Sequence, residues 1–312
     1  MRTRPFRQVD VFTATPYLGN PLAVVLDGTG LSAQEMQHFA HWTNLSETAF
    51  LMPPSEQGAT AGADYRVRIF TPSTELPFAG HPTLGSCHAW LQAGGVPNNQ
   101  KDIVQECEVG LIRIRRTDER LAFAAPPLRR SAPDPAMLAQ VTNAIGLQAQ
   151  QVIAAQLLDN GPVWLALLLD STHTVLALTP DHGALKALGQ KVGVVHVQTR
   201  QAAATLIARS NREARAFGPR STMPDTPTEA SPEVEVRAFA TPVGVQEDPV
   251  TGSLNASLAQ WLIADGHAPK TYVAAQGTCL GRAGRVHIEQ DANGQVWVGG
   301  DCVTCIDGNV LL

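Results

Sequence analysis

Two stretches of the chain predict helices that are apolar on nearly every side. They are His81–Leu91, H-P-T-L-G-S-C-H-A-W-L, and Asp248–Leu258, D-P-V-T-G-S-L-N-A-S-L, and a glycine follows each within a few residues. Glycine is the common residue just beyond a helix C-terminus, so both stretches have a plausible end. A helix without a polar face is usually buried. The pattern therefore predicts two helices at the centre of the fold.

The two stretches also resemble each other in sequence. They align without a gap at an offset of 167 residues (248 − 81), and the identical pairs are Pro82/Pro249, Gly85/Gly252, Ser86/Ser253, Ala89/Ala256 and Leu91/Leu258. In both, a polar side chain precedes a proline, the order expected of a helix cap followed by the first helical residue. We interpret the repeat as two similar domains, each wrapping strands around one central helix.

The remaining apolar runs are short and mostly predict strands. Ser32-A-Q-Glu35 is a capping-box pattern that predicts a helix ending near Asn44. Residues 218–232 are rich in Pro, Ser, Thr and acidic residues, which predicts an exposed loop. Strands are expected at Val9–Phe12, Leu22–Leu26, Tyr65–Thr71, Val163–Leu169, Val192–Val197, Val234–Phe239, Thr271–Gln276, Arg285–Glu289, Gln295–Gly299 and Cys302–Ile306.

Composition narrows the class of protein. The 312 residues are 44% hydrophobic and 16% charged, with a net charge of −5, which indicates a globular chain and argues against a nucleic-acid surface. The N-terminus lacks a signal-peptide core, and the most apolar run, Val163–Leu169, is too short to span a membrane, so we expect a cytoplasmic protein with no membrane partner. Of five scattered cysteines, Cys302 and Cys305 have half a zinc-site spacing but point to opposite faces of a strand, so no metal is expected.

The repeated motifs suggest a binding site. If a pseudo-two-fold axis relates the domains, two helix N-termini face one cleft, with His81, Ser86, Asp248 and Ser253 around it. Helix N-termini attract anions, so such a cleft would bind a small carboxylate. The alternative is that each motif caps its own helix and nothing more. No phosphate loop or dinucleotide fingerprint is present, and no cofactor is expected.

Glu47 is a candidate for proton transfer, since it lies at a predicted junction between loop and strand. Such glutamates are usually solvated charges. If the cleft partly buries Glu47, its pKa would rise toward neutrality, where a carboxyl group can both accept and donate a proton.

Ordered motifs along the whole chain resemble the PhzF family, the phenazine-biosynthesis isomerases and their relatives. They are V-D-V-F-T at 9–13, G-N-P-L-A-V-V-L at 19–26, N-L-S-E-T-A-F at 44–50, E-L-P-F-A-G-H-P-T-L-G at 75–85, E-D-P-V-T-G-S at 247–253, Q-G-x-x-L-G-R-x-G-R from 276 and V-G-G-x-x-V at 298–303. The match is weakest between about 125 and 232.

The resemblance implies an α+β fold similar to diaminopimelate epimerase. Such a fold has two pseudo-symmetric domains, each a curled, barrel-like β-sheet around a central α-helix, with the active site between them. We place the N-terminal half at residues 1–125, joined by the last strand at about 300–312. The C-terminal half then covers 126–299, with its central helix at about 249–264. A homodimer is implied by the resemblance alone.

The resemblance also implies a reaction and a set of site residues. The family's isomerase moves a proton on trans-2,3-dihydro-3-hydroxyanthranilate, a cyclic carboxylate, without metal or cofactor. By motif match, its catalytic residues correspond to Glu47, His81, Asp248 and Ser253, and its substrate-binding glycines to Gly80 and Gly252. We add Ser86 as a substrate-binding candidate from the repeat.

Two alternatives remain open. A racemase or epimerase of the same fold would use two cysteines, one from each half, but neither repeated turn carries one; Cys87 lies beyond Ser86, inside the predicted helix. A protein of this fold could also bind small carboxylates without turnover.

Overall fold

The computed structural model describes residues 1–99, 102–117, 120–198 and 232–312. Its strands are β1 (Thr3–Val11), β2 (Asn20–Val25), β3 (Glu47–Met52), β4 (Tyr65–Phe70), β5 (Glu75–Leu76), β6 (Asp102–Cys107), β7 (Gly110–Thr117), β8 (Arg120–Ala124), β9 (Arg129–Ser131), β10 (Val152–Asp159), β11 (Val163–Leu169), β12 (Lys191–Val197), β13 (Val234–Phe239), β14 (Thr271–Gln276), β15 (Gly284–Gln290), β16 (Val296–Gly300) and β17 (Cys302–Leu311). The helices are α1 (Ala33–Thr43), α2 (Glu56–Thr60), α3 (Gly80–Gln92), α4 (Pro135–Ala144), α5 (Thr172–Ala177), α6 (His182–Leu188) and α8 (Gly252–Ala264), with single 3₁₀ turns at Ala149–Gln151, Thr241–Val243 and Thr278–Leu280.

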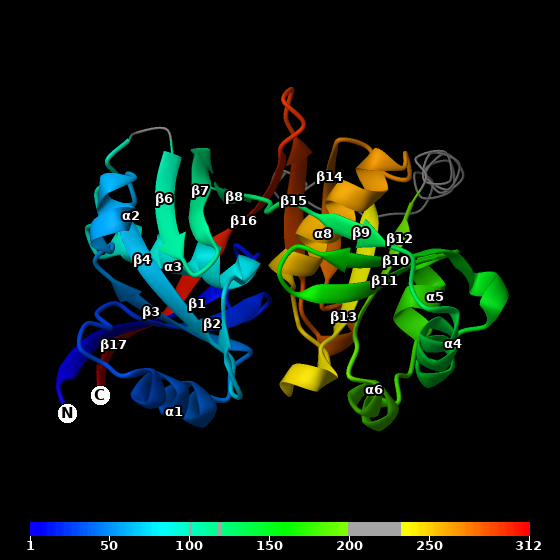
Figure 1. Cartoon of the computed structure of the whole chain (residues 1–312), viewed down its shortest axis with the longest axis horizontal. Helices are drawn as coiled ribbons and strands as arrows, with labels where there is room; N and C mark the ends of the chain where they lie inside the picture. Colours follow the sequence, from blue (N-terminus) through cyan, green and yellow to red (C-terminus); the bar gives the residue numbers. More distant parts are fainter. Residues whose placement is uncertain (100–101, 118–119, 199–231) are drawn as a thin grey trace, which may run out of the picture.

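Two halves of one curled sheet repeat the same series of strand pairings. From β17 through β1, β2, β3, β4, β6 and β7 to β8, the pairs are antiparallel, antiparallel, parallel, antiparallel, parallel, antiparallel and antiparallel. From β9 through β10, β11, β12, β13, β14 and β15 to β16, the order of pair types is identical. An antiparallel pair between β8 and β16 joins the two series. Figure 1 shows the halves side by side, with β17 lying beside β1 although it is last in sequence.

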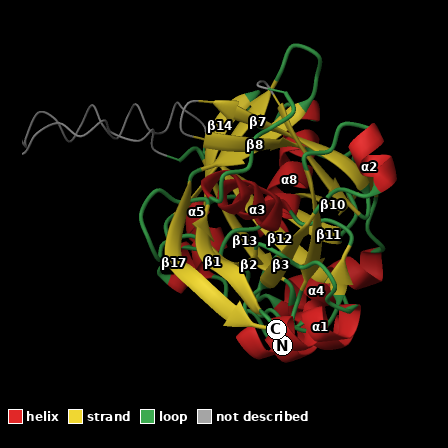
Figure 2. Cartoon of the chain, turned by 90° about the vertical axis from the view of Figure 1, so that its left-hand side faces the viewer, coloured by secondary structure: helices red, strands yellow, loops and turns green. Residues whose placement is uncertain are grey.

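One helix lies inside each half. α3 contacts β1, β2, β3, β6, β8 and β17, and α8 contacts β10, β15 and β16. The side view places α3 in the middle of its strands (Figure 2). Nine of the 13 residues of α3 and ten of the 13 of α8 are buried, which explains why neither stretch has a polar face. The predicted fold, with strands curled around two central helices, is confirmed.

The predicted starts of these two helices are wrong by two or three residues. α3 begins at Gly80, so Pro82 is its third residue, and α8 begins at Gly252 after Thr251, so neither His81 nor Asp248 is a cap. The Asp248 carboxylate instead accepts a hydrogen bond from Thr251 Oγ1 at 2.6 Å. The helix starts therefore differ by 172 residues (252 − 80), and His81 corresponds in helix position to Ser253 rather than to Asp248.

The other helices cover the outside of the sheet. β11 alternates between the two sides: Trp164 and Ala166 pack in the central core, whereas Leu165 and Leu167 pack under α4, α5 and α6. α1 begins with the predicted capping box, in which Glu35 N donates to Ser32 Oγ and Ser32 N donates to the Glu35 carboxylate.

Other predictions fall within or outside the described residues. The predicted strands all lie within strands of the structure, and β17 extends the last of them to Leu311. Residues 218–231 of the predicted loop lie outside the described part of the chain. Among the described helices, none is both long and apolar enough to cross a membrane. The domain boundaries near 125 and 300 stay predictions.

Candidate active site

The N-termini of the two central helices meet at a pair of glycines. A Cβ atom added to Gly80 would lie 2.7 Å from Gly252 Cα, and one added to Gly252 would lie 2.8 Å from Gly80 Cα. Real Cβ atoms do not approach other heavy atoms this closely, so only glycine permits the contact. The backbone N–H groups of the first turns of both helices therefore converge on one place, where they favour negative charge.

Glu47 and His81 face each other beside this contact. Glu47 is the first residue of β3, and its Oε2 lies 3.3 Å from Nδ1 of His81, the second residue of α3. Asn20 Nδ2 lies at the same distance from His81 Nδ1, but its two hydrogens are directed to Asp248 Oδ1 at 2.8 Å and Val250 O at 2.9 Å. His81 Nδ1 therefore remains available to Glu47.

Asp248 belongs to a buried network of hydrogen bonds that joins the halves. Its carboxylate accepts from Asn20 in the N-terminal half and from Thr251 Oγ1 beside α8. Gln276 Nε2 donates to Asp248 O and to Thr251 Oγ1, both at 3.0 Å, and Gln276 Oε1 accepts from Thr251 N at 3.0 Å. Since every member is buried and has a partner, the network holds the Asp248 loop rigidly against β2.

Burial shifts all three titratable groups toward their uncharged forms. Desolvation raises the pKa of Glu47 well above its usual value, and the charge of Asp248 raises it further. Desolvation lowers the pKa of His81 to about 3 and raises that of Asp248 to about 6, against the hydrogen bonds from Thr251 and Asn20. A glutamate with a raised pKa next to a neutral imidazole can release a proton and take it back near neutral pH.

A cavity of about 40 Å³ lies beside these groups. Glu47, Asp248 and Ser253 line it together with Trp164 and Lys191. Further lining residues are Ser46, Thr71, Leu76, Phe78, Ala79, Pro162, Ala240, Val243, Val245 and Thr251. Asn160 Nδ2 donates to Ser253 O at 2.9 Å and so fixes the first turn of α8. The walls come from both halves of the sheet.

The structure brings six of the seven predicted site residues together. Glu47, His81, Gly80, Gly252, Asp248 and Ser253 surround the helix contact or line the cavity. Ser86 does not line the cavity, because it lies six residues into α3, about 9 Å along the helix from Gly80, and is fully buried there.

Sequence reasoning missed several polar residues of the site. Asn20 and Gln276 lie within motifs that carried the family resemblance, which was the available signal for them. Lys191 begins an ordinary apolar strand, and nothing in its neighbourhood marks it. Within the described residues, no group of three His, Cys, Asp or Glu side chains is placed to hold a metal ion.

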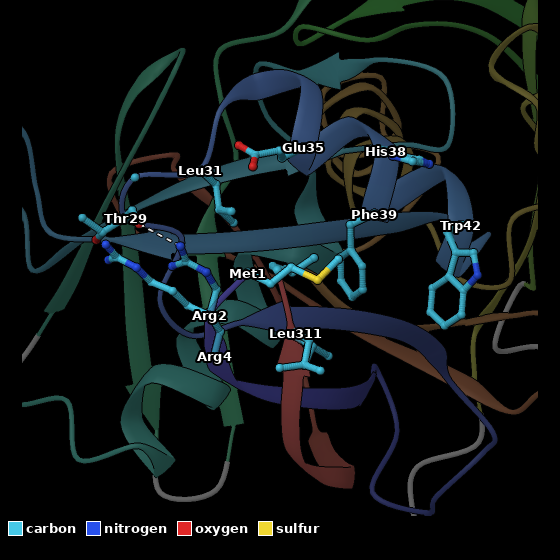
Figure 3. Close-up of a pocket in the computed structure, with 13 residues that line it drawn as sticks. Met1, Arg2, Arg4, Thr29, Leu31, Glu35, His38, Phe39, Trp42 and Leu311 are labelled. Carbon is cyan, nitrogen blue, oxygen red and sulfur yellow. Dashed lines mark hydrogen bonds between the residues drawn. The ribbon is translucent and has the colours of Figure 1, made fainter.

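A larger cavity, of about 700 Å³, lies far from this chemistry. It is lined by α1 and by the ends of the chain, with Phe39 and Trp42 on one side and Met1 and Leu311 on the other (Figure 3). The acidic residue in it, Glu35, is engaged in the helix cap of α1. Because it contains no buried acid–base pair, we place the active site at the smaller cavity.

Comparison with known proteins agrees with this placement. The family model described as phenazine biosynthesis-like protein matches residues 9–308. The chain is 32% identical over 326 residues, covering all of both chains, to the Schizosaccharomyces pombe protein called antisense-enhancing sequence 1. It is 29% identical to trans-2,3-dihydro-3-hydroxyanthranilate isomerase of Pseudomonas aeruginosa, over 97% of this chain and 98% of that protein. The solved structure of a Bacillus anthracis PhzF-family phenazine biosynthesis protein covers all of both chains with a TM-score of 0.77 at 20% identity.

The matched region spans both halves of the sheet and both central helices, and several of the relatives are named isomerases. The chain is an isomerase and belongs to the phenazine biosynthesis-like family of PhzF and its relatives.

Proposed function

We propose that the chain catalyses a cofactor-independent proton shift on a small cyclic carboxylate, with Glu47 as the acid and base. The observation that carries the proposal is the position of Glu47, in a closed cavity, 3.3 Å from a neutral histidine and next to two helix N-termini. The name of the P. aeruginosa relative supports a substrate of the class of trans-2,3-dihydro-3-hydroxyanthranilate.

In this proposal Glu47 carries one proton between two carbon atoms. The ionised carboxylate removes a proton from one carbon, and the electron pair of that C–H bond moves into the conjugated system. Glu47, now protonated, returns the proton to a second carbon on the same face, so the atoms balance without an external acid. The raised pKa of Glu47 makes it a stronger base than an exposed glutamate, and the helix N-termini stabilise negative charge that develops on the substrate.

His81 and Asp248 support this step from opposite sides. Neutral His81 holds Glu47 in place through Nδ1, and its Nε2 has no hydrogen-bond partner among the described residues and is free to contact substrate. Asp248 holds Asn20 and the start of α8. The cavity of about 40 Å³ accommodates only a few water molecules, so the two halves must separate before a ring compound enters.

The test is Glu47→Gln, which keeps the size of the side chain and removes its acid–base chemistry. trans-2,3-Dihydro-3-hydroxyanthranilate is supplied in deuterated water, and both turnover and deuterium incorporation are followed by NMR. We expect a loss of at least 100-fold with Glu47→Gln. The matched control is Glu56→Gln at an exposed glutamate of α2, which should leave the rate unchanged.

Two outcomes would contradict the proposal. Undiminished turnover by Glu47→Gln would remove Glu47 from the reaction. Binding of the substrate by the unaltered chain without turnover or exchange would favour a carboxylate-binding protein of the same fold.

A further inference from the structure

Lys191 occupies the position in the C-terminal half that Glu47 occupies in the N-terminal half. Glu47 begins β3 and pairs with Leu22 of the parallel neighbour β2. Lys191 begins β12 and pairs with Trp164 of the parallel neighbour β11. Because β2–β3 and β11–β12 are the same member of the repeated series of pairings, the two side chains reach the central cavity from opposite halves. Both line it.

The ammonium group of Lys191 has no salt-bridge partner among the described residues. Its Nζ lies 5.8 Å from the centre of the Trp164 ring, a distance at which the ring face attracts a cation. Trp164 is 3% exposed, and its indole N–H has no acceptor among the described residues. Buried donors normally have partners, so an ammonium and an indole N–H that lack them beside one cavity indicate a missing acceptor.

The charges around the cavity favour an anionic acceptor. Lys191 is the cationic side chain among the described residues that line it, while Glu47 and Asp248 contribute two carboxyl groups. A carboxylate substrate would add a third acidic group, and without a nearby cation its desolvation would oppose binding. Burial lowers the pKa of Lys191, whereas Glu47 and Asp248 raise it, and a bound carboxylate would favour the charged lysine further.

We propose that Lys191 binds the carboxylate group of the substrate, with the indole N–H of Trp164 as a second donor. The substrate then lies between Glu47, which contacts the reacting carbons, and Lys191, which fixes the orientation of the ring. This assignment rests on the proposed function only in taking the ligand of the cavity to be a carboxylate. Lys191 thereby selects acids over uncharged analogues of the same shape.

The test compares two ligands that differ in charge and hardly in shape. Anthranilate and anthranilamide are titrated by calorimetry into the unaltered full chain, Lys191→Gln, Lys191→Arg and Lys186→Gln. The last removes an exposed lysine of α6 and is the matched control. We expect Lys191→Gln to weaken anthranilate binding by about 10- to 100-fold, the effect of losing one charge-assisted hydrogen bond, and to leave anthranilamide binding unchanged. Lys191→Arg should retain most of the preference for the acid, and Lys186→Gln all of it.

Three results would overturn the assignment. They are equal affinity of the unaltered chain for the acid and the amide, no binding of the acid, or unchanged binding of the acid by Lys191→Gln. Circular dichroism and thermal unfolding of Lys191→Gln confirm that the variant is folded, and Lys191→Arg tests the same site with charge retained.

The outcome is separable from that of the proposed function. If Lys191→Gln loses anthranilate while Glu47→Gln turns over normally, the carboxylate site stands and the proton-shift proposal fails. If Glu47→Gln abolishes turnover while Lys191→Gln binds anthranilate normally, the carboxylate site fails alone.

Discussion

Replacement of Gly252 by alanine tests whether the contact between the two central helices is as tight as the structure shows. The new Cβ atom would lie 2.8 Å from Gly80 Cα, 2.9 Å from Gly80 C and 2.9 Å from His81 N. All three are backbone atoms, so no side chain can rotate to relieve the overlap. The helices themselves have to move apart.

The size of the effect follows from these distances. Carbon atoms in contact are about 3.5–4.0 Å apart, so α8 must move by roughly 0.7 Å or more. Overpacking of this kind costs about 1–3 kcal/mol, and the better helix propensity of alanine returns about 0.5–1 kcal/mol. We therefore expect the free energy of unfolding to fall by about 1–2 kcal/mol. Turnover should fall at least tenfold, because a shift of this size separates His81 and Glu47 from the elements around Ser253.

The assay is urea unfolding followed by tryptophan fluorescence, with turnover measured on the same preparations. Gly308→Ala is the matched control, because a Cβ atom added at Gly308 of β17 meets nothing within 4 Å. The double variant Gly80→Ala/Gly252→Ala should cost less than the sum of the two single variants, since one separation of the helices relieves both overlaps. If Gly252→Ala unfolds within 0.5 kcal/mol of the unaltered chain, as Gly308→Ala should, the helices do not pack as described.

Two further predictions concern the groups that hold the site. Because the pKa of Asp248 is about 6 in the folded chain and 3.8 in its usual setting, the folded chain binds this proton more tightly, and its stability declines as pH rises from about 4 to about 6. The decline is roughly 3 kcal/mol, (6 − 3.8) times about 1.4 kcal/mol per pH unit, and Asp248→Asn should remove it in urea titrations at pH 4, 5, 6 and 7, leaving only the same-direction contribution of Glu47. Glu247→Gln should lower the free energy of unfolding by about 3–5 kcal/mol, because it leaves the buried Arg237, now held by two 2.9 Å contacts to Glu247, without its counter-charge. Arg129→Gln, which breaks an exposed pair with Asp159, should cost less than about 1 kcal/mol, and equal losses in the two variants would contradict the argument.

The central helices could be predicted from the sequence, but their starts could not. Apolar residues on all sides show that a helix is buried, and this signal is local. Asp248 followed by Pro249 satisfies the local rules for a cap, yet the carboxylate bonds to Asn20, 228 residues away in sequence, and the helix begins four residues later. The tertiary hydrogen bond overrides the cap, so the register of the repeat derived from that cap was wrong as well.

The same distinction applies to the site. Glu47, His81 and Ser253 lie in motifs with a recognisable order, and their convergence agrees with the two-helix arrangement that the repeat predicted. Lys191 carries no motif and enters the site only because β12 repeats the position of β3 in the other half. Such a residue becomes visible only once the pairing of the strands is known. Ser86 shows the reverse: a repeated serine that the helix geometry removes from the cavity.

The pairing of β1 with β17 has a consequence for the order in which the chain can fold. Thr3 pairs with Leu311, and Arg7 bonds Asp307 across 300 residues of sequence. The half that contains Glu47 is therefore synthesised first, yet its sheet lacks β17 until the end of translation, whereas every strand from β9 to β16 has left the ribosome before β17 does. Since distant contacts form slowly, we expect the Lys191 half to become resistant to protease first on a stalled ribosome. The two sides of the catalytic cavity would then be completed at different times, and the acid–base side last.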